Sequence, residues 1–264
     1  MIDKKTYDGE VRRLQDLLDQ IAKSGLAQLR HAHVRLWFRG HSKSGWELQP
    51  GVYRPNFPAT NETERLRIEQ HMTQDFRVRA AGLLTGREKD AELYFLQQHY
   101  RMPTRLLDWT NSPLPALFFA VTENNGSDGE LFMMDAYQLS PGQKAMGFEG
   151  IATARHPIFE KALHPIFRWQ KPNDFPDFII PVRPDHLDHR ISLQRSCFTF
   201  HVPKRRVLTK EENKSLLSFF IPKAAKKHMK KELFWLGIDD FSVFGDLESW
   251  SRRLKTAYRI PQVS

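Results

Sequence analysis

The segment from Leu36 to Ser42, Leu-Trp-Phe-Arg-Gly-His-Ser, places an arginine after an alternating apolar run and directly before a glycine. The guanidinium of Arg39 presents a planar fork of N–H donors that matches a phosphate or a carboxylate. Gly40 has no side chain, so a ligand can approach the backbone closely there. The sequence therefore predicts an anion site at the end of this segment. It leaves open the alternative that Arg39 pairs with a buried carboxylate and supports the strand end.

A second concentration of polar residues lies in residues 97–110, which hold His, Tyr, two Arg, Asp and Trp between two apolar helical patterns. Pro103 disfavours helical backbone in the residue before it, so we expect an extended link between the helices. These side chains form either a paired internal network or the wall of a site. A pair between Arg105 and Asp108 is the simplest network. His99 is one of eleven histidines and is weak evidence for acid–base chemistry by itself.

Apolar residues recur at helical spacing in some segments and alternate in others, which predicts the elements that position these side chains. The helical patterns cover residues 7–22, 62–84, 91–100, 113–121, 223–236 and 246–258. The strand patterns cover residues 34–39, 130–135, 177–182, 192–202 and 216–221, with a short additional strand at 46–49. Residues 138–174 show no regular pattern. This order predicts an α+β (mixed α/β) fold, a single domain with a central mixed or antiparallel sheet flanked by helices.

The composition narrows the class of protein. The 264 residues include one cysteine, Cys197, which excludes an internal disulfide framework and a cysteine zinc cluster and favours a reducing compartment. Met1 to Lys5 lacks the apolar run of a signal peptide, and no apolar stretch reaches the roughly 18 residues of a membrane helix. We therefore expect a cytoplasmic protein without membrane association. Serine or cysteine hydrolysis is not favoured, because there is no Gly-x-Ser-x-Gly turn and Cys197 lies in an apparently buried strand.

The net charge of +9 is compatible with a phosphate-bearing partner, a nucleic acid or a nucleotide. The basic residues that suggest nucleic-acid binding are Lys204, Arg205, Arg206, Lys223, Lys226, Lys227, Lys230 and Lys231. In the helix 223–236 the lysines form one face, and lysines of this kind contact phosphates without reading bases. The alternative is a solvated helix surface with no partner. No zinc-finger or RNA-recognition signature supports the first interpretation.

Several motifs together resemble the FRG domain, a family named for its Phe-Arg-Gly triplet. They are Phe38-Arg39-Gly40, His99-Tyr100-x-x-Pro103-Thr104-Arg105-Leu106-Leu107-Asp108-Trp109-Thr110, Ala116-Leu117-Phe118-Phe119-Ala120, Arg190-Ile191-x-x-Gln194-x-x-x-Phe198-Thr199, Leu236-Gly237-Ile238 and Phe244-Gly245-Asp246-Leu247. The resemblance runs from about Val34 to Leu254. It predicts an N-terminal helical segment at 1–30 and an FRG domain at 31–258, or one continuous domain over 1–264. It departs from the family pattern at Arg195-Ser196-Cys197, where a glycine is usual, and at Gly245, where a proline is common.

The resemblance implies bacterial proteins found in settings suggestive of antiphage defence or toxin systems, and a regulatory protein partner is compatible with such a setting. The string around Arg39 is also similar to the first strand of ADP-ribosyltransferases, which implies an NAD-using site. In that interpretation Arg39, Gly40, His41, Ser42 and Gln194 bind the cofactor, and Arg105 and Asp108 belong to the catalytic group. His99 or Tyr100 positions the ribose, Trp109 or Phe119 stacks on the nicotinamide ring, and a late acid, Glu248 or Asp240, stabilises the developing positive charge. The site proposal assumes that Arg39 faces an open cleft shared with His99, Tyr100, Arg105 and Asp108.

Two other classes of function stay open at this point. The first is a non-catalytic nucleic-acid-binding or protein-interaction module that uses the basic residues of 204–231. The second is a metal-dependent nuclease with Asp108, His99 and Asp135 as ligands. The spacing of these three residues matches no metal motif, so we predict no metal.

Overall fold

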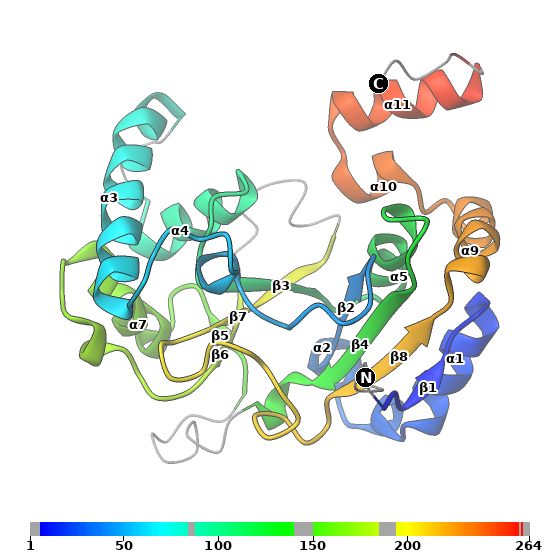
Figure 1. The fold of residues 1–264 in the computed structure, drawn as a ribbon, viewed down its shortest axis with the longest axis horizontal. Helices are drawn as coiled ribbons and strands as arrows, with labels where there is room; N and C mark the ends of the chain where they lie inside the picture. Colours follow the sequence, from blue (N-terminus) through cyan, green and yellow to red (C-terminus); the bar gives the residue numbers. More distant parts are fainter. Residues whose placement is uncertain (1–5, 84–87, 140–149, 185–193, 259, 261–264) are drawn as a thin grey trace.

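A computed structural model describes residues 6–83, 88–139, 150–184, 194–258 and 260 of the chain (Figure 1). In this part of the chain, eight strands form one mixed sheet in the order β1-β8-β4-β2-β3-β7-β6-β5. The strands are β1 (Gly9–Glu10), β2 (Leu36–His41), β3 (Leu106–Thr110), β4 (Gly129–Asp135), β5 (Ala152–Thr153), β6 (Ile180–Arg183), β7 (Ser196–Phe200) and β8 (Leu217–Ile221). Most neighbours are antiparallel, and the two parallel pairs, β1 with β8 and β5 with β6, lie at the two edges. The predicted α+β class with a mixed sheet is confirmed.

The α-helices and the short 3-10 turns connect these strands. The helices are α1 (Leu14–Lys23), α2 (Ala32–Arg35), α3 (Glu62–Ala80), α4 (Asp90–His99), α5 (Pro113–Thr122), α7 (Pro157–Phe167), α9 (Lys223–Trp235), α10 (Asp240–Phe244) and α11 (Leu247–Ala257). The 3-10 turns are η1 (Leu26–Gln28), η2 (Gly51–Tyr53), η3 (Ala81–Leu83), η4 (Ala136–Gln138) and η5 (Pro172–Asp174). Within the described residues, no helix has both the length and the apolar character needed to cross a bilayer.

Helices cover one face of the sheet and loops cover the other. On the helix side, α1, α5, α9 and α10 pack on β2, β4 and β8 around Phe38 and Phe219, while α3, α4 and α7 pack on the half formed by β3, β7, β6 and β5 around Leu106 and Phe200. On the opposite face, Trp37, Trp109 and Cys197 form a separate core closed by loop residues. Because strand side chains alternate between faces, this arrangement decides which residues of β2 and β3 face each other.

The structure corrects several element predictions. Residues 7–22 are not one helix, since β1 pairs with β8 before α1 begins. Residues 46–49 form no strand, and residues 103–110, expected to be only an extended link, contain β3. Residues 138–174 contain α7, in which proline occupies the first position and recurs at Pro165 near the end of the helix. Ser112 occupies the N-cap position of α5 without a side-chain hydrogen bond.

Candidate functional site

Arg39 lies where β2 and β3 separate. The two strands pair at Phe38 and Thr110, and beyond that pair Nη1 of Arg39 donates a 2.5 Å hydrogen bond to the backbone oxygen of Asp108. Its Nε donates to Nε2 of His41 at 2.9 Å. Alternation places Arg39 on the loop-covered face with the Trp37 core and Asp108 on the helix-covered face. The guanidinium therefore reaches Asp108 through the space between the two strands.

The charge of Arg39 is only partly compensated. Its side chain is 14% exposed, and the Oδ2 atom of Asp108 lies 3.8 Å from Nη1. Burial lowers the pKa of Arg39 to about 10, an effect that Asp108 opposes and the nearby charge of Arg54 reinforces. Arg39 therefore stays a cation at neutral pH in a region where its charge is disfavoured. A further anion near this group would be stabilised by the remaining positive charge.

Asp108 presents a carboxylate at the rim of a cavity. Its side chain is 57% exposed, and both carboxylate oxygens accept hydrogen bonds of 3.0 Å from Nε2 of Gln98. The other end of that amide, Oε1, accepts a 2.5 Å hydrogen bond from the hydroxyl of Thr104. The amide of Gln98 is thus oriented with its donor end toward the acid. Asp108 is held from two sides, by Gln98 and by Arg39, while its outer surface stays open to solvent.

The cavity beside Asp108 has a volume of about 40 Å³, enough for roughly three water molecules. Its lining consists of Phe95, Gln98, His99, Asp108, Gln194, Ser196 and Phe198. It thus combines an aromatic floor with polar groups, including the carboxylate of Asp108. Neither Arg39 nor Arg105 contributes to the lining, so the assumption of one open cleft shared by Arg39, His99, Arg105 and Asp108 is wrong. Arg39 is linked to this cavity only through its contacts with the backbone and the carboxylate of Asp108.

Gln194 lines the same cavity and carries a buried amide donor. Its Nε2 atom is buried and finds no hydrogen-bond partner among the described residues. The segment is held by its backbone, since the hydroxyl of Thr110 donates a 2.7 Å hydrogen bond to the carbonyl oxygen of Gln194. An unpaired buried amide is energetically unfavourable and is typical of a position completed by water or a ligand. Gln194 therefore stays a binding candidate, and the neighbouring motif residues Arg190 and Ile191 lie outside the described residues.

Arg105 is a core residue and does not pair with Asp108. It has no exposed surface, and its guanidinium donates to Glu69 at 2.5 and 2.9 Å and to Glu62 at 2.7 Å. The hydroxyl of Tyr53 is a further partner. Burial disfavours the charge, but the surrounding acidic groups outweigh burial and raise the pKa of Arg105. The catalytic role predicted for Arg105 is therefore not supported, since two carboxylates already neutralise it inside the fold.

Gly40 is required by packing and not by a ligand. A Cβ atom at this position would lie 1.9 Å from the backbone oxygen of Ala116 and 2.7 Å from the backbone nitrogen of Ala120. Both atoms belong to α5, which covers the opposite face of β2 from Arg39. The glycine of the Phe-Arg-Gly triplet thus allows α5 to approach the sheet. The cofactor contact predicted for Gly40 is therefore wrong, because the backbone of α5 occupies the space that a ligand would need.

His41 and Ser42 are also integrated into the fold. His41 is buried, accepts the bond from Arg39 and packs edge-on against Phe132 at a centroid distance of 5.1 Å. Ser42 is buried as well, and its hydroxyl accepts a 2.8 Å hydrogen bond from Asn124. Of the residues 39–42 predicted to bind a cofactor, only Arg39 is therefore placed next to the cavity-lining carboxylate.

Comparison with protein-family models matches residues 34–129 to the FRG domain. The chain contains an FRG domain. The match includes Arg39, His99, Arg105 and Asp108, and it ends before the later motifs that resemble the family, from Arg190 to Leu247. Comparison with curated proteins and with solved structures gave no match. The matched segment carries β2, α3, α4, β3 and α5, and the match names no reaction.

Two aromatic residues of the FRG domain are unsuited to stacking on a ligand. Trp109 is 3% exposed, and its Nε1 donates to the hydroxyl of Thr199 at 3.1 Å. Phe119 lies on α5, on the helix-covered face, and packs against Phe118 and Phe244. Tyr100 is 54% exposed and meets His99 edge-on at 5.1 Å. Stacking by Trp109 or Phe119 is therefore contradicted, whereas His99 lines the cavity and Tyr100 lies next to it in the chain.

The late acids predicted from the ADP-ribosyltransferase resemblance lie beyond the matched FRG segment. Glu248 is on α11 and forms a 2.7 Å ion pair with Arg252, to which Asp240 of α10 also pairs at 3.6 Å. Figure 1 shows α10 and α11 stacked beyond α5, at a distance from the β3–β7 region that carries the cavity. The structure does not bring Glu248 or Asp240 to Arg39. Asp108 is the carboxylate that occupies this position.

Most of the predicted nucleic-acid-binding residues have partners within the fold. Lys204 and Arg205 pair with Asp177, Arg205 pairs also with Glu212, and Arg206 pairs with Glu62. Lys226 is buried, and its Nζ donates to the backbone oxygens of Ser42, Glu123 and Asn124. Lys230 donates to the backbone oxygen of Thr122 and to Asn125. The prediction of a single lysine face on this helix is therefore wrong for Lys226 and Lys230, because the ammonium groups of both donate hydrogen bonds to backbone carbonyl oxygens of the fold.

The ligand set considered for a metal is not assembled. Asp135 is fully buried, forms an ion pair with Arg35 and accepts a hydrogen bond from the backbone of Tyr137 at 3.0 Å. It lies at the far end of β4, whereas Asp108 lines the cavity between α4 and β7. The combination of Asp108, His99 and Asp135 is thus contradicted by the pairing of Asp135 with arginine.

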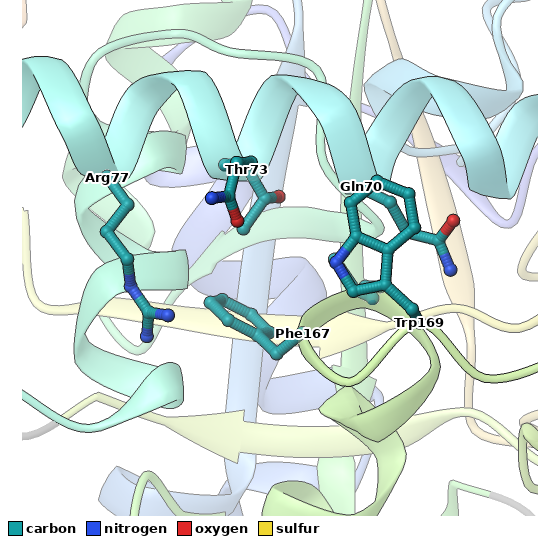
Figure 2. Close-up of a pocket in the computed structure, with 7 residues that line it drawn as sticks. Gln70, Thr73, Arg77, Phe167 and Trp169 are labelled. Carbon is teal, nitrogen blue, oxygen red and sulfur yellow. The ribbon is translucent and has the colours of Figure 1, made fainter.

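A second, smaller cavity lies between α3 and the end of α7 (Figure 2). Its volume of about 10 Å³ holds one water molecule at most. Figure 2 shows Arg77, Thr73 and Gln70 along α3 above Phe167 and Trp169. Gln70 already donates to the backbone oxygens of Pro165 and Gln170, at 2.8 and 3.3 Å. This cavity is a packing gap at a helix junction, and it offers no second site for a small molecule.

The residues that sequence reasoning missed are those that orient or complete the site. Gln98 was part of the polar stretch but had no assigned role, and Arg54 and His201 were not considered. His201 is fully buried, with the hydroxyl of Thr199 2.8 Å from its Nε2 and the backbone oxygen of Arg206 3.0 Å from its Nδ1. Burial lowers the pKa of His201 to about 3, and the charge of Arg39 adds to this. Only the spatial proximity of β2, β3 and β7 reveals that these groups influence one another.

Proposed function

We propose that the FRG domain is an ADP-ribosyltransferase-like enzyme that uses NAD, with Asp108 as its catalytic carboxylate and Arg39 as the cation behind it. The observation that carries the proposal is the solvent-exposed carboxylate of Asp108, fixed by Gln98 and Arg39 at the rim of a polar cavity. Fixed carboxylates of this kind stabilise the positive charge that develops on a sugar when its glycosidic bond breaks. The assignment replaces Glu248, which lies elsewhere.

The cavity suits one end of such a ligand and not the whole of it. Ligand pockets for molecules of this size have volumes of roughly 300–1,000 Å³, whereas this cavity measures about 40 Å³. The unpaired amide of Gln194 and the carboxylate of Asp108 fit the hydroxyl groups of a ribose. The remainder of a dinucleotide would lie along the surface outside it. Bound NAD would supply the nicotinamide leaving group, which departs with the electron pair of the glycosidic bond, and water or an acceptor nucleophile would form the new bond to the same sugar carbon and release a proton.

The residues of the chain then have distinct tasks. Asp108 faces the sugar, and Gln98 keeps both of its oxygens in place. Arg39 holds the backbone of Asp108 through the hydrogen bond from its Nη1 atom and places a positive charge 3.8 Å from the carboxylate. His99 and Gln194 contact the ligand at the wall of the cavity. Arg39 is thus a positioning residue in this proposal, and the group that touches the reacting sugar is Asp108.

The test follows nicotinamide release from NAD by the purified protein, together with calorimetric titration of ADP-ribose. We expect Asp108→Asn to lower the rate at least a hundredfold with little change in ADP-ribose affinity, because the amide keeps the shape and removes the charge. Glu248→Gln is the matched control, and it should leave both quantities unchanged. If the wild type neither releases nicotinamide nor binds ADP-ribose at millimolar concentration, the proposal is wrong. Loss of turnover in Glu248→Gln would return the role to the late acid.

A defence or toxin role is the cellular form of the same proposal. Expression of the wild type should arrest bacterial growth, and Asp108→Asn should relieve the arrest at equal protein level. A wild type that is harmless when expressed would count against a toxin role.

The alternative of a nucleic-acid-binding module built on the whole of 204–231 receives less support, because five of the eight basic side chains have partners in the fold.

A further inference from the structure

The helix α9 carries a basic and aromatic face that the rest of the described structure leaves uncovered. Lys223, Lys227 and Lys231 are exposed, and none of them forms an ion pair with a described residue. Phe234 and Trp235 at the end of the helix are 59% and 73% exposed. At 3.6 residues per turn these five side chains lie within about 120° of one another around the helix axis. They form one surface, which we call the α9 face.

The opposite side of α9 is fully used by the fold. Lys226, Met229 and Leu233 are buried, and the last two belong to the core formed with α5 and β8. Glu232 accepts a 2.9 Å hydrogen bond from the backbone nitrogen of Leu14 and so ties α9 to α1. Figure 1 shows α9 at the outside of the molecule, beside α1 and β8. The α9 face is therefore presented on a rigid, packed helix.

We propose that the α9 face binds single-stranded nucleic acid without reading its sequence. The three lysines follow one another at about 6 Å along the helix axis, and lysines arranged as a track neutralise successive phosphates of a single strand. The two exposed rings then supply planar surfaces on which bases stack, since every base has a π-face. The positive net charge of +9 attracts such a polyanion over a distance.

The composition of the α9 face argues against a lipid surface as the occupant. A helix that lies in a membrane interface needs apolar residues along its whole length on the membrane side. Here the apolar side of α9 is already buried against α5, and the outer side begins with three lysines spaced four residues apart before the two rings. The nearby charges are Lys230, which donates to Thr122 and Asn125, His228, which pairs with Glu232, and Asp128, which accepts from the backbone nitrogen of Lys223. The two acids among them, Asp128 and Glu232, form no ion pair with the exposed lysines of the α9 face.

The experiment measures fluorescence anisotropy of a labelled oligo(dT) of about 20 nucleotides, longer than a typical single-strand site of roughly 4–16, between about 50 and 200 mM salt. The wild type should bind it more tightly than a duplex of the same length. Changing Lys223, Lys227 and Lys231 together to glutamine should reduce the slope of log K against log salt by about 2, because each neutralised phosphate of a single strand contributes about 0.7. Trp235→Ala should weaken binding at least about fivefold.

Two controls separate a specific face from general charge. The triple variant Lys161→Gln, Lys171→Gln and Lys214→Gln removes the same charge from exposed lysines on other segments, and it should change the slope by less than half as much. Inorganic polyphosphate has phosphates but no bases, so Trp235→Ala should leave its affinity unchanged. Equal losses in both triple variants, or equal effects of Trp235→Ala on both ligands, would overturn the proposal. The proposal would also be overturned if the wild type bound phosphatidylserine vesicles and not oligo(dT), and if the α9 variants abolished that vesicle binding. Thermal unfolding confirms that each variant is folded.

Discussion

Two arginines of the FRG domain, Arg105 and Arg39, have opposite relations to their surroundings. Arg105 has no exposed surface, two carboxylates as partners and the ring of Phe175 4.2 Å from its guanidinium carbon. Arg39 has one carboxylate oxygen at 3.8 Å, and that carboxylate is itself largely exposed. The acidic partners of Arg105 raise its pKa despite burial, whereas burial lowers the pKa of Arg39 to about 10. Both arginines belong to motifs of the FRG domain, but only the charge of Arg39 is incompletely compensated by its acidic partner.

The largest effect should come from breaking the enclosed cluster. Arg105→Met leaves Glu69, which is only 2% exposed, without its cation, whereas Glu62 keeps its ion pairs with Arg65 and Arg206. Removing one partner of a buried ion pair costs about 3–5 kcal/mol of stability. The free energy of unfolding in denaturant measures it, and Arg12→Met, at an arginine whose side chain is 63% exposed, should change it by less than about 0.5 kcal/mol. A loss below about 1 kcal/mol for Arg105→Met would show that the cluster is not enclosed as described.

Gly40→Ala should cause a somewhat smaller loss in the free energy of unfolding than Arg105→Met. This variant tests how closely α5 packs on β2 next to Arg39. The new methyl group would overlap the backbone of α5 at Ala116. Overpacking of this kind costs about 1–3 kcal/mol, and we expect the upper end because backbone cannot move aside as a side chain can. Gly126→Ala is the control, because a Cβ there meets nothing within 4 Å. An unchanged melting temperature for Gly40→Ala would contradict the close approach of α5.

Arg39→Met should destabilise the protein by about 1–2 kcal/mol, less than Arg105→Met. The substitution removes the hydrogen bonds to His41 and to the Asp108 backbone, each of a modest net value, and it also relieves the cost of a desolvated charge. The same denaturation experiment compares the two variants directly. If the two losses were equal, Arg39 would be a structural residue of the same kind as Arg105.

The smallest effect concerns pH and links Arg39 to His201. The pKa of His201 is about 3 in the folded protein and about 6.5 when unfolded, so the unfolded chain binds more protons between these values. Stability is therefore fully present above pH 6.5 and falls as pH decreases toward 3. Arg39→Met removes a repulsive charge, raises the pKa of His201 and makes this acid loss shallower, by less than the roughly 1.4 kcal/mol of one pKa unit.

Unfolding measured at pH 4, 5, 6 and 7 resolves this difference. His201→Asn provides the reference, because it removes the titrating group and keeps a donor for the Arg206 carbonyl. Its pH dependence should be shallower than that of the wild type and of Arg39→Met. If the stability of Arg39→Met fell more steeply at low pH than that of the wild type, Arg39 and His201 would not be close enough to interact.

Local patterns predicted most of the elements well. The alternation before Gly40, the long helical pattern from Glu62 and the buried run at 130–135 became β2, α3 and β4 with small shifts at their ends. The pattern failed where prolines hide a helix, as in α7, and where a very short strand is stabilised by its neighbour, as in β1. In both cases tertiary packing supplies the stability that local preference lacks.

The sequence by itself determined the presence of an FRG domain, the α+β class and the two polar segments that meet at Arg39 and Asp108, because motifs and periodicity are local properties of the chain. The tertiary structure alone decided which charged groups are neutralised. Arg105 finds Glu69 36 residues away, Arg39 finds Asp108 69 residues away, and Lys226 finds the carbonyl of Ser42 184 residues away. The free energy of a charge depends on burial and on its nearest partner, and both are set by packing between distant segments.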